Sequence, residues 1–236
     1  TPCAFTSVGP DVASVSCHQS VTVDPSGKFA YVANQVSITI SAYTIHAITG
    51  ALAPIDADPA TAGIQNFAAG TTPFSVTVDP SGKFAYVANW DSGDVSAYSI
   101  NTGTGALTQI NCGGGAGCNG VNSMAMTGPI SVSVDPSGKF AYVANENSDN
   151  VWSFTINAAT GTLNSVDAVP AEDNPMSVSV DPSGKFVYVA NSNSDNLSAY
   201  SIDASTGALT PLAAASTVAA RNGPASLAIT KGTAAV

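Results

Sequence analysis

The sequence predicts an all-β fold of the β-propeller class, and three observations support this prediction. Residues 21–34 (Val-Thr-Val-Asp-Pro-Ser-Gly-Lys-Phe-Ala-Tyr-Val-Ala-Asn) recur unchanged at 76–89 and with one or two changes at 132–145 and 178–191. Each copy is followed by a turn signal and two more short strand-like segments. No stretch shows sustained helical periodicity. Four antiparallel strands in a repeat of about 50 residues are typical of a propeller blade.

The repeated segment predicts two strands joined by a tight turn. Apolar and polar residues alternate at 21–23, as in a half-buried strand. Asp24-Pro-Ser-Gly27 predicts the turn, because Asp accepts backbone N–H bonds, Pro presets φ at about −65° and Gly takes the left-handed conformation. The second strand follows, with Phe29 and Tyr31 on one face. We expect the Asp to fix the turn and the Lys after it to be a solvated charge.

A third and a fourth strand are expected in every copy. The expected third strands are 41–45, 95–100, 151–156 and 197–202, and the expected fourth strands are 52–55, 107–110, 163–166 and 209–212. A Thr-Gly turn separates the two strands in each case. An aromatic residue recurs at one position of the third strand and is expected in the core; its four copies are Tyr43, Tyr98, Phe154 and Tyr200.

The ends of the chain predict how the propeller closes. We expect a single domain, residues 1–236, with repeats at about 20–72, 73–128, 129–174 and 175–223. Residues 1–19 resemble degenerate outer strands, whereas 226–230 align with the first strand of the complete repeats. A composite blade formed from 1–19 and 224–236 would remove the exposed sheet edges. The sequence therefore predicts five four-stranded blades, with 226–230 as the innermost strand of the composite blade.

The repeat also resembles a known family. Phe-Ala-Tyr-Val-Ala-Asn after Asp-Pro-Ser-Gly-Lys is similar to the YVTN-type repeat of lactonase-like β-propellers, and the resemblance extends over nearly the whole chain. It implies the propeller fold. It also implies, as one possible function, hydrolysis of sugar lactones by polar residues gathered at one mouth of the channel. Because one fold hosts many functions, the resemblance does not by itself assign the activity.

Composition excludes several classes of partner. The net charge is −10, and four of the six basic residues are the repeat lysines Lys28, Lys83, Lys139 and Lys185. Nucleic acid is not expected as a partner, because phosphate binding needs basic patches. No apolar run approaches the length of a membrane span, and no basic amphipathic helix is present, so membrane insertion is not expected either. The expected partner is a protein or a carbohydrate, bound through loops on one face.

The four cysteines form two local pairs. Cys3 and Cys17 flank a Gly-Pro turn signal, and Cys112 and Cys118 bracket a glycine-rich loop. Two disulfides, and therefore an extracellular or periplasmic location, are the expectation. Four reduced thiols or a metal site are the alternative. The Cys-x5-Cys spacing is not that of metal ligands, and we expect no metal and no cofactor.

Four residues are candidates for ligand binding. Trp90 and Trp152 stand where the other copies have polar residues, so each is either an exposed platform for a sugar or peptide or a packing residue between blades. Asp91 and Asp94 belong to an oxygen-rich turn, which suits calcium but equally suits hairpin-turn chemistry. The long links 56–72 and 111–128 are either binding loops or neutral insertions.

No catalytic motif is evident. The chain lacks Gly-x-Ser-x-Gly and His-Glu-x-x-His, and neither His18 nor His46 has an evident partner. The main expectation is therefore a secreted, non-catalytic propeller that acts as a binding or structural module. A lactonase-like hydrolase of sugar lactones is the first alternative. The second is an assembly or filament subunit in which a terminal strand completes a blade of the next copy.

Overall fold

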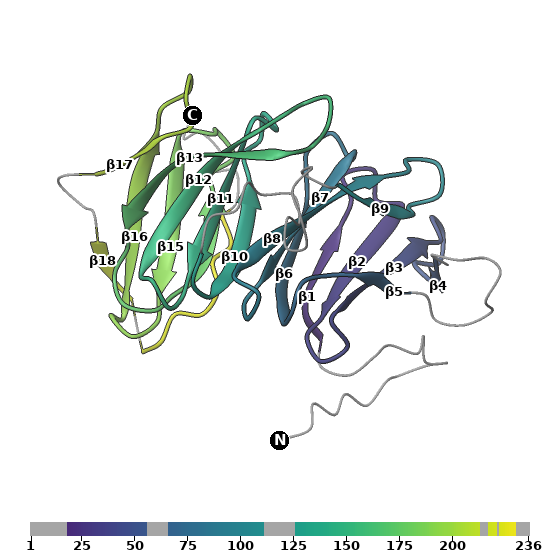
Figure 1. Ribbon diagram of the computed structural model, residues 1–236, viewed down its shortest axis with the longest axis horizontal. Coiled ribbons are helices and arrows are strands. Elements are labelled where there is room, and N and C mark those ends of the chain that lie inside the picture. The colour runs from purple at the N-terminus through teal and green to yellow at the C-terminus, as the bar shows by residue number, and fades with distance from the viewer. Residues whose placement is uncertain (1–17, 56–65, 111–125, 213–216, 221, 230–236) are drawn as a thin grey trace.

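Four antiparallel sheets make up the described part of the chain. The computed structural model describes residues 18–55, 66–110, 126–212, 217–220 and 222–229. These residues contain strands and no helix, so none of them could cross a membrane as a helix. The sheets follow one another in chain order across the molecule (Figure 1). The expected all-β fold and its four-stranded antiparallel repeat are confirmed.

The four sheets share one strand order, in which each strand pairs with the next along the chain. The first sheet contains β1 (His18–Val23), β2 (Phe29–Asn34), β3 (Thr39–Ile45) and β4 (Leu52–Pro54); the second β6 (Pro73–Val78), β7 (Phe84–Asn89), β8 (Asp94–Ile100) and β9 (Leu107–Gln109); the third β10 (Pro129–Val134), β11 (Phe140–Asn145), β12 (Asn150–Ile156) and β13 (Leu163–Pro170); the fourth β14 (Pro175–Val180), β15 (Phe186–Asn191), β16 (Asn196–Ile202) and β17 (Leu209–Pro211). Short strands β5 (Asn66–Ala68) and β18 (Thr217–Ala219) also pair with β3 and β16.

The Asp of each repeat holds its turn together, as expected. In the first copy, Asp24 Oδ1 accepts hydrogen bonds from the amides of Lys28 (2.8 Å) and Phe29 (2.7 Å), and Oδ2 accepts from the amide of Ser26 (3.0 Å) and its hydroxyl. Burial raises the pKa of the Asp24 carboxyl, but the hydrogen bond from the Ser26 hydroxyl and those from the three amides outweigh it and hold the pKa below its ordinary value. Asp181 makes the same bonds, and its pKa is lowered for the same reasons.

Neighbouring sheets pack face to face through a repeated contact. Phe29 and Tyr31 are buried against residues of the second sheet. Gly105, in the Thr-Gly turn of that sheet, has a φ of 76°, and a Cβ there would lie 2.4 Å from Phe29 Cδ1. The Tyr31 hydroxyl donates to the Gly105 carbonyl at 2.9 Å. The contact recurs between later sheets as Phe84–Tyr86–Gly161 and Phe140–Tyr142–Gly207. The turn glycine is therefore required by the preceding sheet as well as by its own turn.

The first strands of consecutive sheets lie side by side, in the order β1, β6, β10, β14. A serine hydroxyl on each first strand accepts a hydrogen bond from the next first strand. These bonds join Val76 N to Ser20 Oγ (3.3 Å), Val132 N to Ser75 Oγ (3.4 Å) and Val178 N to Ser131 Oγ (3.1 Å). The spacing of the repeats thus fixes how each sheet meets the next.

The same bond continues beyond the fourth sheet. Leu227 N donates to Ser177 Oγ at 3.3 Å, and the Leu227 carbonyl accepts from the Ser179 hydroxyl at 3.4 Å. Leu227 therefore occupies the place of a next first strand, as the alignment predicted. However, residues 224–229 form no strand, so of the expectation for 226–230 only the place beside the fourth sheet is found in the described residues. No described strand forms a backbone ladder with residues 224–229.

The first sheet has an exposed position that is buried in the other three sheets. Val21 on β1 is 67% exposed, whereas Val76, Val132 and Val178 at the same position are 3–5% exposed because the preceding sheet covers them. No described residue takes the place of a preceding sheet over Val21. The four cysteines (Cys3, Cys17, Cys112, Cys118) and residues 1–17 of the expected composite blade lie outside the described residues.

Candidate functional site

One end of the four sheets gathers the residues that vary between repeats. We call it the link face: it consists of turns 35–38, 90–93, 146–149 and 192–195, with the links 69–72, 126–128, 171–174 and 222–223. The first strand of each sheet begins at this end and the second strand ends there. The Asp-Pro-Ser-Gly-Lys turns lie at the opposite end, which we call the Asp-Pro face.

The backbone at the link face repeats from sheet to sheet. The residue before the first strand of the second, third and fourth sheets has a left-handed φ: 61° at Thr72, 68° at Gly128 and 59° at Asn174. Its carbonyl accepts a hydrogen bond from the residue that follows the repeat Asn. These bonds are Trp90 N to Thr72 O (2.9 Å), Glu146 N to Gly128 O (2.8 Å) and Ser192 N to Asn174 O (2.8 Å). The fold therefore presents one variable side chain per sheet at an equivalent position.

Glu146 connects three sheets at this position. Its Oε2 accepts a hydrogen bond from the indole N–H of Trp90, which belongs to the second sheet. Its Oε1 accepts from Nδ2 of Asn174, at the start of the fourth sheet, at 2.9 Å. The amide of Asn174 in turn donates to Asp149 Oδ1 at 2.9 Å. The carboxylate is thus held by two neutral donors from different sheets while its side chain stays partly exposed.

Gly128 makes this arrangement possible. A Cβ at Gly128 would lie 2.8 Å from Asn147 Nδ2 and 3.0 Å from Trp90 Nε1. Any larger residue would push against the indole nitrogen that binds Glu146. The glycine is therefore needed for its φ and for the close approach of Trp90.

The Glu146 carboxylate has the properties of a general base. Each oxygen accepts one hydrogen bond from protein and keeps a further lone pair. Both donors are neutral side chains, and together they fix the orientation of the carboxylate. A water molecule at its exposed edge could give up a proton to it. The arrangement can therefore activate water toward an electrophilic carbon.

Two of the candidate ligand residues lie at the link face. Trp90 is partly buried and packs against the core between the third and fourth sheets. It is therefore a packing residue that stays partly exposed, rather than a free platform. Asp91 is exposed and accepts a hydrogen bond from the Thr72 hydroxyl.

Asp94 has a structural role. Its Oδ1 accepts hydrogen bonds from Asn89 Nδ2 (2.7 Å) and Ser92 Oγ (3.0 Å). The same amide bond joins Asn145 to Asn150 and Asn191 to Asn196 in the next two sheets. In the third and fourth sheets the acceptor is an uncharged Asn, so the negative charge of Asp94 is not needed for the turn.

Trp152 packs between the second and third sheets. It lies against the core formed by those sheets and stacks on Phe154, with ring centroids 6.2 Å apart. It replaces a buried serine hydroxyl, which in the other sheets accepts a hydrogen bond from the repeat Asn; these serines are Ser41, Ser96 and Ser198. Asn145 instead donates to the Val143 carbonyl at 3.3 Å. Trp152 and Trp90 belong to different clusters, so the structure does not join them into one site.

Sequence reasoning missed Glu146, Asn174 and Gly128. A signal was present: the residue after the repeat Asn is Gln35, Trp90, Glu146 and Ser192 in the four copies, although the residues before it hardly change. Such variation at one position of a constant scaffold marks a place where function can differ from fold.

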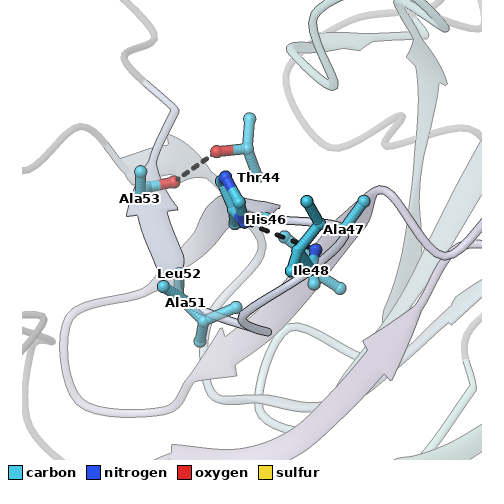
Figure 2. A pocket seen from close by; sticks show the side chains of 8 residues that line it. Thr44, His46, Ala47, Ile48, Ala51, Leu52 and Ala53 are labelled. Atoms are coloured by element: carbon cyan, nitrogen blue, oxygen red, sulfur yellow. Dashed lines mark hydrogen bonds between the residues drawn. The ribbon is translucent and has the colours of Figure 1, made fainter.

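A hollow away from the link face offers less chemistry. Figure 2 shows a hollow at the outer edge of the first sheet, lined by Thr44, His46 and Ile48 among others. His46 Nδ1 accepts from the amides of Ile48 (3.4 Å) and Thr49 (3.3 Å), so the imidazole closes its own turn. Nowhere among the described residues do three or more His, Cys, Asp or Glu side chains gather in a way that could hold a metal ion.

Comparison with known proteins gives a consistent result. The family model described as lactonase, 7-bladed β-propeller, matches residues 21–118 and 115–222. Two proteins named 6-phosphogluconolactonase match part of the chain: one from Formosa agariphila is 32% identical over 140 residues, and one from Bacillus subtilis is 31% identical over 112 residues. The solved structure of a periplasmic gluconolactonase from Pseudomonas aeruginosa superposes with a TM-score of 0.65 at 23% identity and covers 88% of this chain.

This chain is shorter than the proteins that it matches. It spans 36% of the Formosa agariphila protein, 31% of the Bacillus subtilis protein and 55% of the Pseudomonas aeruginosa structure. At 23% identity the structural match shows the fold alone. The family and the names of these relatives nevertheless overturn the expectation of a non-catalytic binding or structural module. Of the functions expected from the sequence, they support the lactonase-like hydrolase.

Proposed function

This chain belongs to the lactonase family of seven-bladed β-propellers, and from that premise we propose that it hydrolyses sugar lactones at the link face. Glu146 is the proposed general base. Trp90 and Asn174 are the proposed positioning residues, because they hold the two oxygens of the Glu146 carboxylate. The single observation that supports this assignment is a partly exposed carboxylate fixed by neutral donors from two neighbouring sheets.

The proposed reaction adds one water molecule to the lactone ester. The Glu146 carboxylate takes a proton from water as its oxygen attacks the carbonyl carbon of the lactone. When the tetrahedral intermediate collapses, the bond between that carbon and the ring oxygen breaks. The protonated Glu146 returns the proton to the departing ring oxygen, which becomes a hydroxyl. The product is the open-chain hydroxy acid, and the carboxylate of Glu146 is restored.

Lactonase assays with one substitution test this assignment. We expect the protein to accelerate acid release from D-glucono-1,5-lactone above the spontaneous rate. Glu146→Gln should lower kcat by about 100-fold or more, since a general base contributes on the order of 10² to 10⁴. Asp203→Asn, on an exposed carboxylate at the Asp-Pro face, is the matched control and should leave kcat unchanged. Full activity in Glu146→Gln would show that Glu146 is not the base, and no acceleration by the unaltered protein would refute the function.

The proposed ligand contacts are those that the link face leaves accessible. We propose that the sugar contacts the partly exposed Trp90 and the exposed Asp91. Asp94 and Trp152 are engaged inside the sheets and are assigned no contact with it. The proposed substrate replaces the broader expectation of a protein or carbohydrate partner.

We also propose that the chain is one propeller domain in which residues 1–19 and 224–236 form a composite fifth blade. The bonds between Leu227 and the fourth sheet support a further blade after it. Disulfides Cys3–Cys17 and Cys112–Cys118 and a periplasmic or extracellular location belong to the same proposal. The location is supported by the similar fold of the periplasmic gluconolactonase from Pseudomonas aeruginosa. An experimental structure with residues 1–19 far from 224–230 would overturn the closure, and four free thiols in a labelling assay would overturn the disulfides.

A further inference from the structure

The link face is strongly acidic. Its turns and links, together with the strand starts beside them, carry seven carboxylates: Asp91, Asp94, Glu146, Asp149, Glu172, Asp173 and Asp195. Within the described ranges of those turns and links there is no lysine or arginine. Asp91, Asp149, Glu172, Asp173 and Asp195 are exposed, so their charges act directly on an approaching solute.

The positive charges of the described chain lie at the other end. Lys28, Lys83, Lys139 and Lys185 all belong to the turns of the Asp-Pro face, and all four are exposed. This placement follows from the repeat, because each Lys comes directly after the turn Gly at a fixed place in the sheet. The lysines are therefore separated from the link face by the length of the strands, and they cannot neutralise it at short range.

The negative charge of the link face would act differently on a phosphorylated lactone and on a free sugar lactone. A phosphate monoester carries close to two negative charges at pH 7 and offers only acceptor oxygens. The exposed carboxylates would repel such a phosphate and could not donate a hydrogen bond to it. The hydroxyl groups of a free sugar lactone are donors. They match the acceptor-rich surface and carry no charge to be repelled.

We infer that the lactone hydrolysed at the link face is an uncharged aldonolactone, with a free hydroxyl where a sugar phosphate ester would carry its phosphate. This inference rests on the function proposed above and names its substrate class. It separates the chain from the relatives named 6-phosphogluconolactonase, whose name specifies a phosphorylated substrate. The exposed Glu172 and Asp173, which adjoin Asn174, are the residues assigned to repel the phosphate.

Two substrates and two salt concentrations test the inference. With the full chain, kcat/KM is measured for D-glucono-1,5-lactone and for its 6-phosphate at about 20 mM and 500 mM salt, with spontaneous hydrolysis subtracted. We expect the free lactone to be preferred by at least about tenfold at low salt. Raising the salt should increase kcat/KM several-fold for the 6-phosphate only, because salt screens repulsion between exposed charges over about 10 Å at 0.1 M.

A double variant separates electrostatics from shape. Glu172→Gln with Asp173→Asn should raise kcat/KM for the 6-phosphate several-fold and leave the free lactone unchanged, whereas Asp203→Asn at the Asp-Pro face should change neither. Equal use of both lactones, or preference for the 6-phosphate, would overturn the inference and leave the proposed function standing. Turnover of neither lactone would remove the proposed function, and the inference with it.

Discussion

The hydroxyl of the repeat tyrosine allows the contribution of the contact between sheets to the free energy of unfolding to be measured. A tyrosine at the same repeat position in another sheet provides the control. Tyr86 is fully buried, and its hydroxyl donates to the Gly161 carbonyl of the next sheet at 3.0 Å. Burial raises the pKa of Tyr86 above its ordinary value, and the Asp79 carboxylate adds to the effect, so the hydroxyl is protonated and can donate at neutral pH. Tyr188 is the same residue of the repeat in the fourth sheet, but it is only partly buried, and among the described residues no hydrogen bond from its hydroxyl is found.

We expect Tyr86→Phe to destabilise the protein by about 1.5 kcal/mol. The substitution removes one hydrogen bond and leaves a buried carbonyl without its donor, which costs about 1–3 kcal/mol. With a urea dependence of about 2.5 kcal/mol per molar, the unfolding midpoint should fall by roughly 0.6 M at unchanged slope. Tyr188→Phe should change the free energy of unfolding by less than about 0.5 kcal/mol, as is usual for positions without such a contact.

Urea titrations followed by circular dichroism and by tryptophan fluorescence provide the measurement. The two variants lose the same atom from the same repeated sequence, so the difference between them isolates the bond to the neighbouring sheet. If Tyr188→Phe lowers the midpoint as much as Tyr86→Phe does, the bond between sheets is not the source of the stability, and the reasoning fails.

Three further predictions concern the position of Trp90 at the link face, the hydrogen bonds of the buried Asn side chains, and stability at low pH. Gly128→Ala should shift the indole N–H signal of Trp90 in ¹H–¹⁵N spectra, because its Cβ would crowd Trp90 Nε1, whereas Gly138→Ala has a similar φ with its nearest neighbours at 3.8 Å and should leave that signal in place. Ser96→Ala should cost about 1–2 kcal/mol of unfolding free energy, because a buried Asn89 N–H loses its partner at 2.9 Å, and the exposed-site control Ser99→Ala should cost less than about 0.5. Because the pKa of Asp24 and of Asp181 is lowered in the folded protein, their contribution to stability is present above the unfolded pKa of about 3.9 and is lost as the pH falls through the folded value. The melting temperature should therefore decrease as the pH is lowered below about 4, and this decrease should be smaller in Asp24→Asn. A melting temperature of the unaltered protein that does not change in this pH range would contradict the prediction.

The repeated parts of the fold could be predicted from the sequence because their causes are local. The turn at Asp24 needs only the residues within it, and the alternation of the following strand needs only its own pattern. The contact between Phe29 and Gly105 joins different repeats, so no local pattern reveals it. The final segment shows the limit of alignment: Leu227 makes the hydrogen bond expected of a first strand, but the alignment does not reveal that residues 224–229 form no strand.

The candidate site was predicted only in part, and for a related reason. Trp90 was identified because tryptophan is unusual at a polar position. Glu146 and Asn174 are ordinary residues for a turn and a link, and only the packing of three sheets brings them to one carboxylate. The acidic character of the link face could not be predicted from the net charge, because a net charge does not say where the charged residues lie. The structure is needed to place the lysines at the opposite end.

The bond from each first strand to the serine of the preceding one gives the array a nearest-neighbour energetics. Outside its own sheet, each first strand contacts mainly the first strands of the neighbouring sheets, so the total stability is close to a sum of similar steps between neighbours. Gene duplication or loss of one repeat would then preserve this serine bond at each new junction, and the number of sheets could change while the bond is kept. By the same rule, a sheet at either end of such an array has one neighbour instead of two, and a ring gains most from the one junction that removes both ends.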